Sequence, residues 1–179
     1  IPKRPRPLID FPTVNYPPKT PKPKKFMARL ENYPEAVRNH LLKLPCPTFD
    51  STPFNRPIPM KEQRVALVST AGLHLRGDRP FGLGDADHRL IPRDTPANHM
   101  VMSHISTNFD RTGYLQDLNV VFPLERLNDL ARNGEIGSVA EYHTSFMGAT
   151  EPEKMESTVV ELASVMKKDG VNTVLLVPV

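Results

Sequence analysis

Proline is distributed very unevenly along this chain, and this limits what the first third can fold into. Within residues 1–60 lie 14 of the 20 prolines of the 179-residue sequence. Proline fixes φ and has no N–H group, so it is excluded from helix interiors and central strands. We therefore predict an extended, proline-rich amino-terminal arm over residues 1–60, followed by a folded domain over residues 61–179.

Charge divides the chain at nearly the same place. Residues 1–63 carry 12 Lys and Arg against 5 Asp and Glu, whereas residues 64–179 carry 11 against 15. The basic arm lacks interleaved aromatic side chains for stacking on bases, so we favour wrapping around a neighbouring subunit over nucleic-acid binding. Within the arm, residues 33–44 form the one predicted helix, because apolar residues recur there at helical spacing.

The composition excludes several classes of protein. A single cysteine, Cys46, rules out an intramolecular disulfide and a multi-cysteine zinc site. No apolar run approaches the roughly 20 residues that a membrane helix needs, and the first residues are basic rather than hydrophobic. We expect a soluble, cytoplasmic protein with no membrane partner.

From residue 64 onward, β-branched apolar runs alternate with amphipathic stretches, which is typical of an α/β domain with a parallel sheet. Apolar spacing predicts helices over residues 123–133 and 153–168. We predict four parallel strands, at residues 64–70, 98–104, 138–144 and 171–179. The expected fold is α/β with a mostly parallel, Rossmann- or flavodoxin-like sheet. A parallel strand normally continues into a helix, so we expect the domain to continue beyond Val179.

Polar residues follow the predicted strands, at the edge where ligands of parallel α/β sheets bind. His74 follows the first strand, and His104, Asp110 and Arg111 end or follow the second. Phe146 and Met147 follow the third. We expect His74, His104, Phe146 and Val179 to border one cleft, with both imidazoles within about 10 Å of the Val179 end. The alternative reading is a set of solvated loop residues with structural histidines.

Other kinds of site have weaker support. A metal site could be assembled from five residues, but no pair of them has the i, i+4 helical or short-hairpin spacing of known sites. These residues are Asp85, Asp87, His88, Asp94 and His99. Neither a G-x-G-x-x-G nor a G-x-S-x-G pattern is present. We therefore expect no metal and no dinucleotide cofactor in this chain.

From Val65 to Val179 the sequence resembles the selenoprotein B family of the glycine, sarcosine, betaine and D-proline reductases, with a layout most similar to the D-proline reductase branch. The blocks that carry the resemblance are VALVSTAGLHLRGDRPF (65–81), the run from SHIS to GSVA (103–140), SFMG (145–148) and DGVNTVLLVPV (169–179). The resemblance implies an α/β protein that reductively cleaves a C–N bond at the α-carbon of an amino acid or related amine.

The same resemblance implies where the redox residue belongs. In the family, a selenocysteine or a cysteine directly follows the strand that corresponds to VLLVPV, which places the nucleophile just after Val179. A strand end leading into a helix N-terminus would stabilise a thiolate or selenolate. Three explanations stay open: a fragment or cleaved subunit, a non-standard residue after Val179, or a member that has lost reductase chemistry.

Two functional hypotheses follow from the resemblance. The first is a subunit or fragment of a reductase complex, with His74 and His104 in proton transfer or nucleophile activation. Asp110 would orient one imidazole, and Arg111 would bind the substrate carboxylate. Phe146 and Met147 would contact the substrate. A partner chain would supply a pyruvoyl group that activates the amine; partners are other reductase subunits or the chain's own carboxyl-terminal part, in a homo- or hetero-oligomer. The second hypothesis is a non-catalytic binding or assembly subunit.

Overall fold

The computed structural model describes residues 30–44, 48, 50–51, 55–106, 109 and 111–179. The described residues fall into two units, one within residues 1–54 and the other within residues 55–179. Most of the predicted arm, with Cys46, lies outside the described residues, so the extended arm stays a prediction. Its one predicted helix is confirmed as α1, Glu35–Leu42, which has Pro34 at its N-cap and follows a short 3₁₀ turn.

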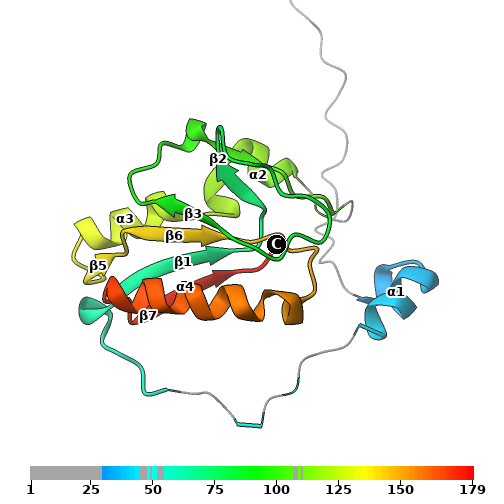
Figure 1. Cartoon of the computed structure of the whole chain (residues 1–179), viewed down its shortest axis with the longest axis horizontal. Helices are drawn as coiled ribbons and strands as arrows, with labels where there is room; N and C mark the ends of the chain where they lie inside the picture. Colours follow the sequence, from blue (N-terminus) through cyan, green and yellow to red (C-terminus); the bar gives the residue numbers. More distant parts are fainter. Residues whose placement is uncertain (1–29, 45–47, 49, 52–54, 107–108, 110) are drawn as a thin grey trace, which may run out of the picture. The chain divides into compact units, whose positions relative to one another are not determined.

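A central strand organises the second unit (Figure 1). On one side, β1 (Arg64–Ser69) pairs in parallel with β7 (Thr173–Val177). On the other side it pairs in parallel first with β5 (Ser138–Val139) and then with β6 (Tyr142–Ser145). The α/β class and the strands predicted at residues 64–70, 138–144 and 171–179 are confirmed. An additional strand, β3 (Arg89–Pro92), pairs antiparallel with β6.

The continuous apolar sequence of β1 is explained by burial on both faces. Val65, Ala66 and Leu67 are all nearly inaccessible to solvent. In the main core, α3 (Leu124–Arg132) and the segment before it pack against the sheet through Leu124, Leu127 and Phe122, among others. A second helix, α4 (Glu156–Lys168), lies in front of the sheet in Figure 1 and buries Leu162. Strand β7 leaves Val174, Leu175 and Leu176 exposed.

Strand β4 (Met100–Met102) corrects the predicted topology. It does not join the parallel sheet but pairs antiparallel with β2 (Leu73–Leu75) in a separate two-stranded sheet. The physical reason is Gly72, which has φ of 65° and turns the chain between β1 and β2. The prediction that residues 98–104 form a parallel strand of the main sheet is therefore wrong. The antiparallel β3 and the separate β2–β4 pair give no support to the Rossmann- or flavodoxin-like assignment.

The two predicted long helices are confirmed, as α3 and α4, with a 3₁₀ turn over Pro152–Met155 ahead of α4. Gly134 and Gly170 follow them with φ of 68° and 71°, as expected of helix C-caps. A short helix, α2 (Thr112–Gln116), and the 3₁₀ turn Leu118–Val120 have no clear sequence signal. In the part of the chain that the structure describes, no helix has the length and apolarity needed to cross a bilayer.

Candidate active site at the carboxyl edge of the sheet

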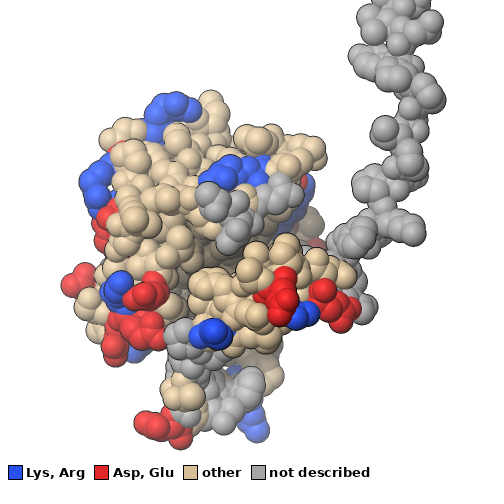
Figure 2. All heavy atoms as spheres, turned by 90° about the vertical axis from the view of Figure 1, so that its right-hand side faces the viewer, with Lys and Arg blue, Asp and Glu red and all other residues tan. Residues whose placement is uncertain are grey.

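The segments that follow three of the strands meet at Thr70, the residue after β1. The N–H of Val179 donates to Thr70 Oγ1 at 2.8 Å, and the N–H of Thr70 donates to the Val177 carbonyl at 3.2 Å. The N–H of Gly148, beyond β6, donates to the Thr70 carbonyl at 2.9 Å. The chain segments beyond β1, β6 and β7 are therefore held together at one point. Figure 2 views the domain from the side toward which β1 and β7 run, and most of the surface in the upper part of that view is uncharged.

Gly148 lies between His104 and this point. A Cβ built on Gly148 would lie 2.8 Å from the carbonyl oxygen of Val179, 2.8 Å from that of Thr70 and 3.1 Å from Nε2 of His104. The imidazole nitrogen and the Val179 carbonyl thus flank the same small space. The structure therefore brings His104 and Val179 together, even though the strand that leads to His104 is not part of the main sheet.

The protonation state of His104 follows from its surroundings. The ring is buried, and its Nδ1 accepts a hydrogen bond from the N–H of Ser106 at 3.2 Å. The neutral ring therefore carries its proton on Nε2. This atom is buried and has no hydrogen-bond partner among the described residues. Burial, and then the positive charge of Arg111, lower the pKa of His104 below its usual 6.5. At neutral pH the side chain is a neutral hydrogen-bond donor.

Arg111 organises the loop that follows His104. Its guanidinium donates to the carbonyl oxygen of His104 and also contacts the carbonyls of Ser106 and Phe109. The ring of Phe109 lies under the guanidinium at 5.6 Å and beside the His104 ring at 5.0 Å. Arg111 is thus occupied with main-chain acceptors, and its binding of a substrate carboxylate stays a prediction. Asp110 lies outside the described residues.

The second predicted histidine occupies a different setting. His74 is in β2, opposite Val101, and is 4% exposed. Its Nδ1 donates to the carbonyl of Leu75 at 2.9 Å, which leaves Nε2 as a buried acceptor without a partner among the described residues. No contact found in the described part of the chain joins His74 to His104 or Val179, so its role in proton transfer stays a prediction.

Phe146 and Met147 lie beneath the edge rather than on it. Phe146 is 3% exposed and packs against the ring of His88, with 5.7 Å between ring centroids. Met147 is fully buried and lies against Gly72. Their predicted contact with substrate stays a prediction, since both are covered by protein atoms here.

Sequence reasoning did not single out Thr70 or Gly148. Gly148 ends the SFMG block, and a glycine after a strand is a signal of close main-chain approach. No sequence feature, however, indicates which atoms approach it. Thr70 gives no signal at all, because its role depends on a partner 109 residues away in the chain.

The residues weighed for a metal are engaged in other contacts. Asp85 and Asp87 pair with Arg79, and Asp87 also pairs with Arg89. Across the described ranges, no three His, Cys, Asp or Glu side chains are grouped so that they could hold a metal ion.

A separate open cleft of about 470 Å³ lies between α3 and β5. Its arginines, Arg93 and Arg132, are already paired with carboxylates of Glu141 and Asp129. Neither His104 nor Val179 lines this cleft. We therefore place the candidate site at the residues that follow β1, β6 and β7 and not in this cleft.

Comparison with known proteins shows which family this chain belongs to. Residues 37–179 match the family described as glycine/sarcosine/betaine reductase selenoprotein B. The chain belongs to this family. The proposed resemblance is thereby confirmed for the selenoprotein B family over most of the chain.

Two relatives of this selenoprotein B chain are similar along much of its length. It is 38% identical over 120 residues to the D-proline reductase subunit gamma of Acetoanaerobium sticklandii, which covers 65% of this chain and 49% of the relative. It is 30% identical over 139 residues to the sarcosine reductase complex component B subunit beta of Peptoclostridium acidaminophilum, which covers 74% of this chain and 32% of the relative. The chain thus spans half or less of the length of these relatives. No solved structure matches it.

Proposed function

We propose that this chain forms part of a subunit of an amino-acid reductase complex of the glycine, sarcosine, betaine and D-proline type. The reaction is reductive cleavage of a C–N bond at the α-carbon of the substrate. The names of the two relatives, a D-proline reductase subunit and a sarcosine reductase component, support the reaction class. The observation that carries the proposal is that His104 Nε2 and the Val179 carbonyl oxygen flank the same small space at Gly148.

The proposal places the selenocysteine or cysteine of the family immediately after Val179. Thr70 fixes the Val179 peptide from both sides, because its hydroxyl accepts from the Val179 N–H at 2.8 Å and donates to the Val179 carbonyl at 3.3 Å. A residue after Val179 would begin beside the Nε2–H of His104. A neutral imidazole N–H donates a charge-assisted hydrogen bond to a thiolate or selenolate and so favours the anionic nucleophile.

The proposed chemistry is a two-electron reduction. The selenolate or thiolate forms a bond to the α-carbon while the C–N bond breaks, and the nitrogen leaves with the bonding electron pair and takes up a proton. A thiol then attacks the selenium or sulfur, so that the α-carbon takes the electron pair and a proton. A second thiol regenerates the nucleophile and a disulfide is released. The carbonyl group implied for a partner chain would activate the amine as a leaving group.

This chemistry also supports the expected setting of the protein. A catalytic selenolate or thiolate and a dithiol reductant require a reducing compartment, which favours the cytoplasm. The partner-supplied carbonyl requires a hetero-oligomer with other reductase subunits. A metal has no role in the steps proposed.

The test is a substrate panel on the complete native assembly. D-proline, sarcosine, betaine and glycine are each incubated with dithiothreitol, and ring opening or amine release is measured together with disulfide formation. We expect turnover of one substrate class, with one disulfide per product, and loss of turnover after pre-treatment with iodoacetamide. Absence of turnover for every substrate, with all subunits present and the redox residue verified by mass spectrometry, would contradict the proposal.

A further inference from the structure

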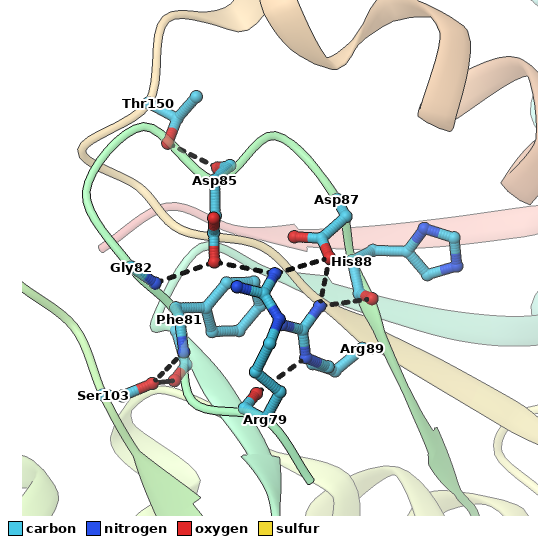
Figure 3. Close-up of polar contacts among 10 residues, drawn as sticks. Arg79, Phe81, Gly82, Asp85, Asp87, His88, Arg89, Ser103 and Thr150 are labelled. Carbon is cyan, nitrogen blue, oxygen red and sulfur yellow. Dashed lines mark hydrogen bonds and ion pairs between the residues drawn. The ribbon is translucent and has the colours of Figure 1, made fainter.

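A short segment between β2 and β3 spans the two sides of the candidate site. We call residues 81–85 the strap. At one end, the N–H of Phe81 donates to Ser103 Oγ at 2.8 Å, next to His104. At the other end, the carbonyl of Asp85 accepts from Thr150 Oγ1 at 2.6 Å, two residues beyond Gly148. Figure 3 shows both anchors joined through this segment.

The strap is closed on itself by Asp85. Its carboxylate Oδ2 accepts from the N–H of Gly82 at 2.7 Å, and its own N–H donates to the Gly82 carbonyl at 3.3 Å. An aspartate that bonds to a nearby main-chain N–H stabilises a tight turn. The distance between the two anchors is therefore fixed by a turn that is held by hydrogen bonds.

The strap also has a buried foot. Phe81 is 5% exposed, and the guanidinium of Arg89 lies 4.3 Å from the centre of its ring. The Arg89 side chain is 11% exposed and donates through Nε to the Arg79 carbonyl at 3.2 Å. The strap thus rests on packed groups at its Ser103 end.

By contrast, the ion pairs of Arg79 lie at the surface. Arg79 approaches Asp85 at 3.1 Å and Asp87 at 3.2 Å, but its side chain is 63% exposed. Water screens exposed pairs of this kind, so they add little to stability. The strap is therefore held by the hydrogen bonds of Asp85 and Thr150 rather than by Arg79.

Both anchors lead directly into the site. The N–H of Ser103 donates to the Gly72 carbonyl at 3.0 Å, and the N–H of Thr150 donates to the Met147 carbonyl at 3.1 Å. Thr150 is 7% exposed. A shift at either anchor is therefore passed along a few bonds to His104 or to Gly148.

We propose that the strap is the positioning element of this site, and that Thr150 and Asp85 are positioning residues that hold Nε2 of His104 against the main chain at Gly148 and Val179. Its catalytic consequence rests on the proposed function. The geometric part does not, and it can be measured on the protein without substrate.

Three variants separate the hydrogen bonds from the ion pairs. Thr150→Val removes the hydroxyl donor and keeps the shape of the side chain, whereas Thr150→Ser keeps the donor. Arg79→Met removes the exposed ion pairs and leaves the strap bonds intact. The wild-type full-length protein and the three variants are compared at equal concentration, after circular dichroism has shown that each is folded.

The readout is the environment of His104. Its titration is followed by NMR, with the signal assigned from a His104→Gln spectrum, and amide hydrogen exchange is measured over residues 148–151. Arg111 is the charged group that acts on His104 in the described structure, and no variant changes it. We expect Thr150→Val to move the His104 pKa upward toward 6.5, as water reaches the ring, and to speed exchange about tenfold or more. Thr150→Ser and Arg79→Met should match the wild type.

The outcomes distinguish this proposal from the proposed function. If Thr150→Val has the same His104 pKa and the same amide exchange rates as the wild type, the positioning role of the strap is wrong, whatever the complex catalyses. If the complex is active, Thr150→Val should lower kcat about 10- to 100-fold with KM nearly unchanged, because misplacement affects the reacting geometry more than binding. If the His104 pKa shifts in Thr150→Val but neither the wild-type complex nor any variant turns over substrate, the result would support the strap and contradict the proposed function.

Discussion

The imidazole Nδ1 of His143 accepts a hydrogen bond of 3.0 Å from the main-chain N–H of Leu67. β1 pairs with β5 at Val65 and with β6 at Val68, so this bond falls in the interval between the two paired stretches. Both residues are fully buried. A side chain thus takes the place of a main-chain acceptor where the pairing of the central strand is interrupted.

Replacing His143 should therefore destabilise the sheet. His143→Leu leaves the buried N–H of Leu67 without an acceptor, which costs about 1–3 kcal/mol. Urea unfolding measures the loss, with the exposed His99 as a matched control, because His99→Leu removes an imidazole of the same size from the surface. Equal stabilities for the two variants would show that the Leu67 bond contributes nothing.

The same histidine predicts a pH dependence of stability. Burial, and then the charge of Arg93, lower the pKa of His143 to about 4 from 6.5. Because the folded pKa lies below the unfolded one, this contribution is complete above pH 6.5 and is lost as the pH falls toward 4. The loss is about 3 kcal/mol for a shift of this size. Burial lowers the pKa of His88 and His104 as well, which acts in the same direction.

Urea midpoints at pH 7.5 and pH 4.5 check this dependence. His143→Gln keeps a hydrogen-bond acceptor but does not titrate, so its stability should fall less between the two pH values than that of the wild type. Identical pH profiles for the two proteins would exclude His143 as a source of the acid sensitivity.

Sequence patterns identified most elements but not all of their partners. β1 and β7 are continuous apolar runs, and such runs predict parallel strands. The burial that usually accompanies such runs holds for β1 but not for β7, which stays largely exposed. The run that contains β4 has the same character, yet it pairs with β2, since the turn at Gly72 places β2 beside it. β3 escaped prediction because a four-residue strand ending in Pro92 carries almost no periodicity.

The candidate site was predictable only in part. His104 follows an apolar run, and the rule for strand ends led to it even though that run lies outside the main sheet. Gly148 and Thr70 act through main-chain distances, and these depend on how β6 and β7 pair with β1. Asp85 and Thr150 lie 65 residues apart in the chain, and their hydrogen bond depends on the folded loop, not on a local pattern.

Gly148 should not tolerate a side chain. In Gly148→Ala the new methyl would lie 2.8 Å from two carbonyl oxygens, those of Thr70 and Val179, and main-chain atoms shift only at a cost of about 1–3 kcal/mol. We expect a lower urea midpoint and at least a tenfold loss of turnover. Gly113→Ala is the control, because its methyl would meet a Val120 side-chain methyl at 3.3 Å in a helix that favours alanine. If both variants behaved alike, the close packing at Gly148 would be wrong.

The start of β1 should depend on Asp169. Its carboxylate pairs with Arg64 at 2.6 Å and accepts from the Glu141 N–H at 2.8 Å, so it joins β1, the end of α4 and the turn before β6. Burial raises its pKa, but the hydrogen bonds from Arg64 and Glu141, with the positive charges of Arg64 and Arg93, outweigh this and lower the pKa below 3.8. Asp169→Ala should cost about 1–3 kcal/mol in urea unfolding. Asp94→Ala, at an exposed residue, is the control, and an equally small effect would contradict the role of Asp169.

The central claim is that His104 acts on the reacting group that follows Val179. Its most direct test is the turnover of the complete assembly, on whichever substrate it reduces, with His104→Leu in place of the wild-type subunit and His99→Leu as the control. Removal of a positioned donor or acid predicts a loss of kcat of about 10²–10⁴-fold, with the control unchanged. A His104→Leu assembly that turns over within twofold of the wild type would contradict the account.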